Sequence, residues 1–208
     1  MIPGAFLAAA PLAATLSAAA CSPEPKLDVA VVAEHHPPDV RSSYTLDELR
    51  GLAARSGRPG RHAPLGFYAG FFGYTVEVTP DGTGASGCGP AMHVRVRMFL
   101  DGRLVEIGAD LGCGRGAVLS HYLAHADHDD RLLSEYARRV TSALDGLTRS
   151  ALPGGSVQGD ARAAVAAAVR RAVDEQLRSY DEDRRRALDA ADNDEELTRL
   201  RAACGRNL

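Results

Sequence analysis

Apolar residues recur at helical spacing from Gly116 to about Ser150, and this long run constrains the fold more than any other feature of the chain. One apolar side chain every three or four positions places the set on one face of a helix. The set comprises Leu119, Leu123, Leu132, Leu133, Tyr136, Val140, Leu144 and Leu147. A second long helix is predicted from about Asp160, on Val165, Val169, Val173, Leu177, Tyr180 and Leu188.

The residues before this run follow the two-residue period of strands. Apolar residues alternate with polar ones over 74–79, which predicts a half-buried strand, whereas the Gly- and Pro-rich residues 58–71 predict a loop. The segment MHVRVRMFLDGRLVEIGA predicts a hairpin that turns on Asp101–Gly102. In that register Val96 faces Ile107 and Met98 faces Val105, so apolar pairs meet on one face.

Strands that come first and long helices that follow predict an α+β fold. We expect a small antiparallel sheet of about three to four strands followed by two long helices. Two short helices complete the prediction. Thr45 and Glu48 form a capping box for the first of them, and Asn193 caps the second, which ends near Cys204.

The first twenty residues carry no charged side chain, and they are apolar and rich in alanine. Residues 1–20 therefore predict an export signal, with Ala18 and Ala20 as the small residues before the cut. The sequence AAAC at 18–21 resembles a bacterial lipobox, which would place a lipid on Cys21. We expect an exported protein of the periplasm or cell envelope, whose membrane contact is a lipid anchor on Cys21. An ordinary cut before Cys21 is the alternative.

The rest of the chain divides into two parts. Residues 21–43 contain prolines and charges and predict a tether with one short strand at 29–32, and residues 44–208 predict a single domain. Export permits disulfides. In the hairpin register, Cys88 comes opposite Arg115, two positions from Cys113, so we predict a Cys88–Cys113 bridge with Cys204 as the competing partner.

The segment HYLAHADHDD carries the candidate chemistry of the chain. His121 and His125 lie one helical turn apart, about 6 Å along the axis, so that both imidazoles can bind one zinc ion. His128 lies about 10 Å beyond His121. It forms a rival pair with His125, as does Asp129.

The hydrolytic form of this spacing, H-E-x-x-H, has a glutamate after its first histidine. That carboxylate accepts the proton of the metal-bound water. Tyr122 stands at this position here. A phenol with an ordinary pKa near 10 is a poor base at neutral pH, so the residue pattern predicts ligands without hydrolysis.

Three segments together resemble the bacterial family called predicted secreted zinc-dependent protease. They are SGCGPAMHVRVRMFL, LGCGRGAVLSHYLAHADHDDRLLSEYARRV and EQLRSYDEDRRRAL, within a match of about residues 72–190. The resemblance implies a zincin-like fold and a zinc cofactor. It also implies His121 and His125 as ligands and Tyr180–Asp181 as the Tyr-Asp pair of the family. No histidine matches the downstream one of the family, so the third-ligand candidates are Asp129, Asp181 and His93.

Three functions stay open at this point. The chain is a metallopeptidase-like envelope protein that binds zinc but does not hydrolyse, an active zinc hydrolase with a rearranged base such as Asp129, or a structural envelope protein with no metal site. Burial of His121 and His125 against the sheet favours a metal site, and exposure favours the structural protein. The net charge of -3 excludes an electrostatic footprint for nucleic acid.

Overall fold

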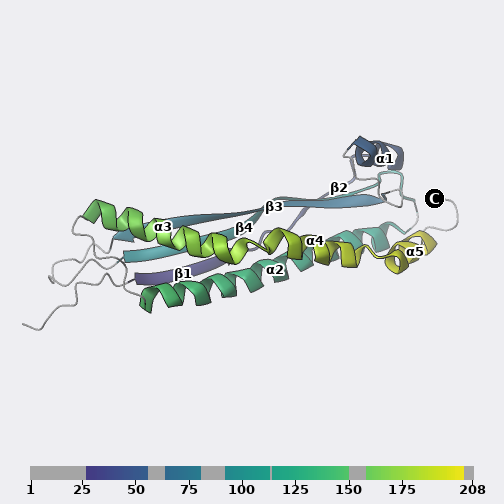
Figure 1. The fold of residues 1–208 in the computed structure, drawn as a ribbon. Coiled ribbons are helices and arrows are strands. Elements are labelled where there is room, and N and C mark those ends of the chain that lie inside the picture. The colour runs from purple at the N-terminus through teal and green to yellow at the C-terminus, as the bar shows by residue number, and fades with distance from the viewer. Residues whose placement is uncertain (1–26, 56–63, 81–91, 113, 150–157, 204–208) are drawn as a thin grey trace, which may run out of the picture.

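The computed structural model describes residues 27–55, 64–80, 92–112, 114–149 and 158–203. Their order is β1 (Leu27–Glu34), β2 (Asp39–Arg41), α1 (Leu46–Arg55), β3 (Gly66–Pro80), β4 (Met92–Ile107), α2 (Arg115–Arg149), α3 (Gln158–Leu177), α4 (Tyr180–Ala191) and α5 (Asp194–Ala203). The α+β prediction is confirmed. The molecule is elongated, and α2, α3 and α4 run along one side of a long sheet (Figure 1). None of the described helices has the length and apolar character needed to cross a membrane.

Strand β4 is the centre of a four-stranded sheet. β3 pairs with it antiparallel along nearly its whole length. β1 pairs in parallel with residues 92–99 of β4, and β2 pairs in parallel with residues 104–106. The prediction of an antiparallel sheet is therefore wrong, since two of its three pairings are parallel.

The parallel strands come from the segment that we predict as a tether. Exposed and half-buried residues alternate through β1, and Leu27, Val29 and Val31 pack against the core. This alternation over eight residues outweighs the prolines and charges around it. Residues 27–34 and 39–41, which lie before the predicted start of the domain at residue 44, are therefore strands of the same sheet.

The predicted hairpin at Asp101–Gly102 does not form, because β4 continues through both residues. Gly102 has a φ of 59°. The pairing with β3 shifts at this point, with two residues of β4 opposite one residue of β3. This is a β-bulge with glycine in the left-handed region. The extra residue reverses the alternation, so that Leu100 before the bulge and Val105 after it both face the core.

Strand β3 begins at Gly66, inside the segment predicted as a loop. Two of its glycines, Gly66 and Gly73, lie against aromatic rings instead of forming turns. A Cβ on Gly73 would lie 2.8 Å from the ring of Phe99, and a Cβ on Gly66 would lie 2.7 Å from the ring of Tyr122. Both distances are shorter than real Cβ contacts.

The second long helix of the prediction is divided into α3 and α4 by a turn at residues 178–179. Tyr180 follows the turn, and its ring packs 4.2 Å from that of Phe72. The hydroxyl of Tyr136 bonds Ser179 at 2.7 Å and Asp183 at 2.6 Å, which holds the turn against α2. The two predicted caps are confirmed, since Thr45 and Glu48 exchange hydrogen bonds and Asn193 accepts from the backbone N–H of Glu196.

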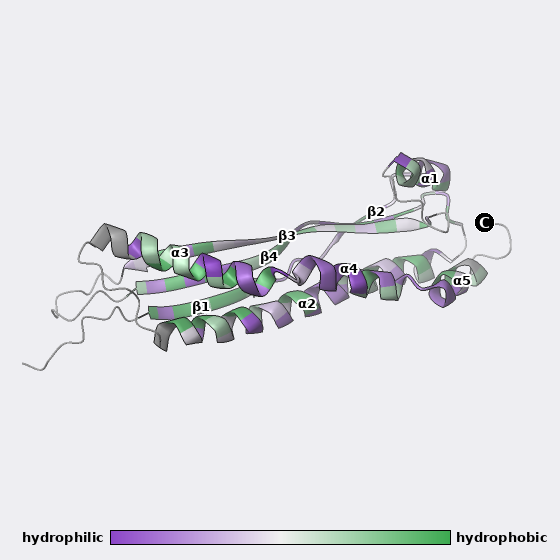
Figure 2. Ribbon diagram, in the orientation of Figure 1, coloured by the Kyte–Doolittle hydropathy of each residue, from purple (hydrophilic) through white to green (hydrophobic). Residues whose placement is uncertain are grey.

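Two hydrophobic clusters lie along the molecule. The first contains the early half of β4, the later half of α2, and residues of α3. The second contains α1, the end of β4, the start of α2 and Leu200 of α5. Apolar residues of α2 and α3 follow the sheet, while α4 is mostly hydrophilic (Figure 2).

Buried polar residues separate the two clusters. Asp129 of α2 is 0% exposed and pairs with Arg184 of α4 at 2.7 Å. Arg103, the first residue after the bulge that faces α2, bonds Asp130 at 2.9 Å and the carbonyl of Ala126 at 2.8 Å. Arg103 also donates to the carbonyl of His36, in the gap between β1 and β2.

The four cysteines, Cys21, Cys88, Cys113 and Cys204, lie outside the described residues. The predicted Cys88–Cys113 bridge depended on the hairpin register. Val96 and Ile107, which that register pairs, instead lie eleven residues apart along β4, about 36 Å. The bridge therefore loses its geometric basis.

Candidate metal centre

His121 and His125 lie on the inner face of α2, where they are 6% and 4% exposed. Their Nε2 atoms are 3.1 Å apart. The helical period puts Val118 on the same face, and the ring of Tyr122 contacts both imidazoles; Val118 and Tyr122 belong to the second hydrophobic cluster. Burial is the property that favours a metal site over solvated histidines, since a buried imidazole requires a polar partner.

Asp192 is the partner of both rings. It caps the C-terminus of α4, and its backbone N–H donates to the carbonyl of Leu188. Oδ1 of Asp192 lies 2.9 Å from Nε2 of His121 and 3.1 Å from Nε2 of His125. Ligand atoms of a tetrahedral zinc ion stand about 3.3 Å apart, given bonds of about 2.0–2.1 Å. The three side chains can hold a metal ion with little rearrangement.

The carboxylate of Asp192 is charged under ordinary conditions. Its partial burial alone would raise its pKa, but hydrogen bonds from His121 and His125 outweigh burial and hold the pKa well below its usual range. The side chain is 47% exposed. One side of the cluster is therefore open to solvent, as a site with a free coordination position requires.

Glu196 supports the site from behind His121. Its Oε1 lies 3.3 Å from Nδ1 of His121, on the ring nitrogen that faces away from Asp192. In a metal-bound state, where an ion takes the place of the hydrogen on Nε2, a carboxylate that accepts from Nδ1 would hold the tautomer whose Nε2 lone pair faces the ion. Glu196 is held in place by Arg199, which donates to it at 2.7 Å and 2.6 Å.

Tyr122 lies next to the site but points away from it. Its hydroxyl donates to the carbonyl of Gly66 at 2.8 Å, and its ring packs edge-on against His121. Burial, and then the charge of Asp192, raise the pKa of Tyr122 above its usual range. The hydroxyl thus keeps its proton and is directed at a backbone carbonyl, so it is unsuited to act as a base.

The predicted third ligands lie elsewhere. Asp129 is engaged by Arg184 and accepts from the hydroxyl of Tyr68 at 2.8 Å. Burial and the charge of Asp129 raise the pKa of Tyr68 to about 12, so that this hydroxyl stays protonated. His93 pairs with Asp28 at 3.0 Å at the start of β4. These groups are held by other partners and do not join the cluster.

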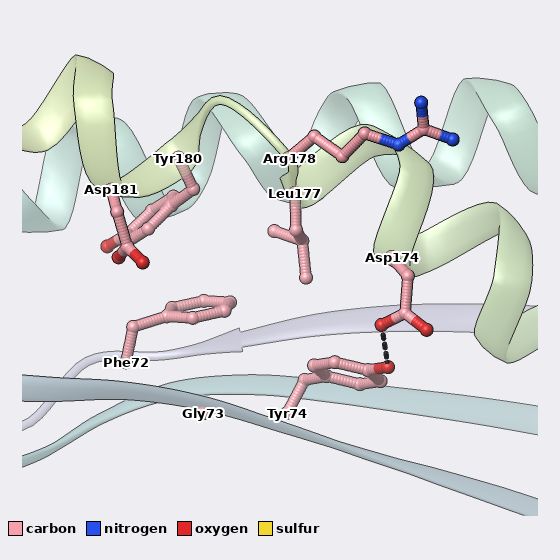
Figure 3. Close-up of a pocket in the computed structure, with 8 residues that line it drawn as sticks. All are labelled: Phe72, Gly73, Tyr74, Asp174, Leu177, Arg178, Tyr180 and Asp181. Atoms are coloured by element: carbon pink, nitrogen blue, oxygen red, sulfur yellow. Dashed lines mark hydrogen bonds between the residues drawn. The ribbon is translucent and has the colours of Figure 1, made fainter.

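Asp181 and His128 are also separate from the site. Asp181 lies eleven residues before Asp192, about 16 Å along a helix. It lines a shallow cavity of about 430 Å³ between β3 and the α3–α4 turn (Figure 3). His128 lies 3.4 Å from Arg131, about 10 Å beyond His121 along the axis of α2. Neither rival pair predicted for His125 is part of the His–His–Asp cluster.

Sequence reasoning missed Asp192 and Glu196. Asp192 is 71 residues from His121, so no local spacing connects the two. The available signal was the position of Asp192 between two predicted helices, directly before the Asn193 cap. A carboxylate at a helix end is held by its backbone and is well placed to project toward a neighbouring helix.

Comparison of the chain with protein-family models, curated protein sequences and solved structures finds no match.

Proposed function

We propose that this protein is an exported envelope protein that binds one zinc ion through His121, His125 and Asp192 and does not hydrolyse peptides. One observation carries the proposal. Two buried imidazole nitrogens and one carboxylate oxygen converge within 4.8 Å of one another, from two separate parts of the chain. The two buried imidazoles need polar partners, and a metal ion shared with the carboxylate of Asp192 would supply one.

The choice of zinc follows from the donor set. Imidazole nitrogen with carboxylate oxygen suits zinc better than calcium or magnesium, which prefer oxygen ligands. Two histidines and one carboxylate leave the fourth tetrahedral position open, as in zinc sites that bind water. Glu196 supplies the outer-sphere carboxylate that orients a histidine ligand.

The proposed lack of hydrolysis follows from the surroundings of this open position. Hydrolysis needs a base that accepts the proton of the metal-bound water. Tyr122 donates to Gly66, Glu196 is bound to His121 and Arg199, and Asp129 is paired with Arg184. Among the described residues, each group considered as a base is already engaged.

A zincin-like ancestry and an exported, lipid-anchored state belong to the same proposal. The ancestry is supported by the spacing of His121 and His125 on a long helix after a sheet, with Tyr122 in place of the glutamate. Export is supported by the uncharged, alanine-rich residues 1–20 and by Ala18 and Ala20 before Cys21. A Cys21→Ser variant should move the protein from the membrane fraction to the soluble fraction. An unchanged distribution would contradict the lipid anchor.

The metal content of the purified protein tests the zinc site. We expect one equivalent of zinc by mass spectrometry, lost in a His121→Ala/His125→Ala variant and reduced in Asp192→Asn. The matched controls are His93→Ala/His128→Ala and Asp181→Asn, which remove the same chemical groups outside the cluster and should retain full zinc. Absence of zinc from the unmodified protein after exposure to the ion, or its retention in both site variants, would contradict the proposal.

A further inference from the structure

Helix α5 is attached to the domain through a small set of contacts. It has ten residues, and an isolated helix of that length is marginal in water. Leu200 is 1% exposed, while Leu197 and Glu196 are half-buried. The other side chains of its first two turns, including Glu195 and Thr198, are exposed. The position of α5 therefore depends on one buried leucine and on the residues at its start.

The residues at the start of α5 are those that meet the histidines of α2. Asp192 contacts both imidazoles, and Glu196 contacts Nδ1 of His121. Asn193 joins the two acidic residues and caps α5, accepting from the backbone N–H of Glu196 at 2.9 Å. This short connection is held by hydrogen bonds. A shift of Asp192 would therefore also shift the first turn of α5.

The buried end of α5 completes the second hydrophobic cluster. Leu200 packs in the same cluster as Leu49 of α1 and Val118 of α2. Helices α2 and α5 meet near α1 at one end of the molecule (Figure 1). Displacement of α5 would expose Leu200 together with the apolar surface that it covers.

We propose that the bound metal ion holds α5 against the second hydrophobic cluster, so that loss of the ion releases α5. We call this coupling between ion binding and α5 docking the latch. This inference rests on the proposed function, because it requires that His121, His125 and Asp192 bind the ion. With α5 docked, the ion has three protein ligands. With α5 released, Asp192 keeps its backbone bond to α4, but Glu196 no longer orients His121 and the connection that follows Asp192 is no longer held. The ion binds the docked state more tightly and therefore shifts the equilibrium toward it.

Amide hydrogen exchange of the full chain, with zinc and with a chelator, tests the latch. At a free zinc concentration 100 times the dissociation constant, docking is favoured by up to about 100-fold. We expect the amides of residues 196–203 to exchange at least about tenfold more slowly with zinc. Those of α3, in the other cluster, should change less. Asp192→Asn should abolish the protection, and the matched Asp181→Asn should preserve it.

Reciprocal coupling supplies a second measurement. If zinc docks α5, then docking of α5 must strengthen zinc binding by the same factor. Leu200→Ala should therefore weaken zinc binding several-fold, although Leu200 belongs to the hydrophobic cluster and not to the ligand set. Val173→Ala, a buried residue of the other cluster, should leave the zinc affinity within about twofold.

These experiments distinguish failure of the zinc site from failure of its coupling to α5. Failure to bind zinc would overturn the proposed function and the latch together. Binding of one equivalent with less than a twofold change in the exchange of residues 196–203 would overturn the latch and leave the zinc site standing. An unchanged zinc affinity in Leu200→Ala, with the variant folded, would also overturn the latch.

Discussion

In the proposed zinc site, Tyr122 stands where an H-E-x-x-H site has a glutamate. A glutamate there would offer a carboxylate to the metal-bound water. The tyrosine instead places its ring against His121 and its hydroxyl on the carbonyl of Gly66. Burial raises the pKa of Tyr122, so the hydroxyl remains a donor. The side chain thus supports the position of the ligand and of β3.

We predict that Tyr122→Phe retains one equivalent of zinc and lowers the free energy of unfolding by about 1 kcal/mol. The hydroxyl is removed from the carbonyl of Gly66, and a hydrogen bond of this kind contributes about that amount. Urea denaturation and metal analysis of the same preparation measure both quantities. Loss of zinc from Tyr122→Phe would show that the hydroxyl is needed at the site, contrary to the geometry.

The bulge in β4 decides which side chains of the second half of this strand face the core. Without the extra residue, Val105 and Ile107 would face the same side as Arg95 and Arg97, away from α2. With it, both join the second hydrophobic cluster, and Arg103 turns toward α2. One glycine therefore lets a single strand serve both clusters.

We predict that Gly102→Ala lowers the free energy of unfolding by roughly 1–2 kcal/mol, the cost of a left-handed conformation for a residue with a Cβ. Gly146→Ala is the matched control. Gly146 lies within α2, and a Cβ there meets nothing within 4 Å. This change should stabilise the protein by about 0.5–1 kcal/mol, because alanine favours a helix. Equal stability of the two variants would contradict the role of the bulge.

We predict that Arg103→Ala lowers the free energy of unfolding by about 3 kcal/mol, because it removes a buried partner of Asp130. The carbonyl of Ala126 also loses its donor. Arg95→Ala removes an exposed arginine from the same strand and should cost less than about 0.5 kcal/mol. Equilibrium denaturation compares the two variants, and a similar loss in both would show that burial of Arg103 has no special effect.

Helix α2 runs through both hydrophobic clusters of the molecule. Its 35 residues span about 52 Å and take part in both hydrophobic clusters. The His–His–Asp cluster joins this helix to the α4–α5 connection, near the second cluster. An ion bound there, as proposed, would stabilise contacts between parts of the chain that are far apart in sequence.

We predict that zinc at 100 times its dissociation constant raises the free energy of unfolding by about 2.7 kcal/mol. For a chain of this length the melting temperature should rise by roughly 5–10 °C. The shift should vanish in His121→Ala/His125→Ala and persist in His93→Ala/His128→Ala. Thermal denaturation followed by circular dichroism measures it. An equal shift in both double variants would mean that zinc acts elsewhere.

Several features could be predicted from local sequence alone. The period of α2, the capping residues Thr45 and Asn193, and the shared face of His121 and His125 all depend on spacing within one or two turns of a helix. The inward positions of β4 were also predictable. A hairpin and a bulged strand both place Val96, Met98, Val105 and Ile107 on one face, so the alternation is the same in either structure.

Tertiary structure decided what local spacing could not. Asp-Gly satisfies a tight turn and a glycine bulge equally well, because both need a residue with positive φ. The choice between them came from β1, β2 and β3, which pair along the whole of β4. Asp192 meets His121 across 71 residues, a contact that exists only because α4 and α5 pack beside α2. The shared face of His121 and His125 therefore follows from the sequence alone, because it depends only on helical spacing. The contact of both histidines with Asp192 depends on the tertiary fold, because it requires helices that are distant in sequence to pack together.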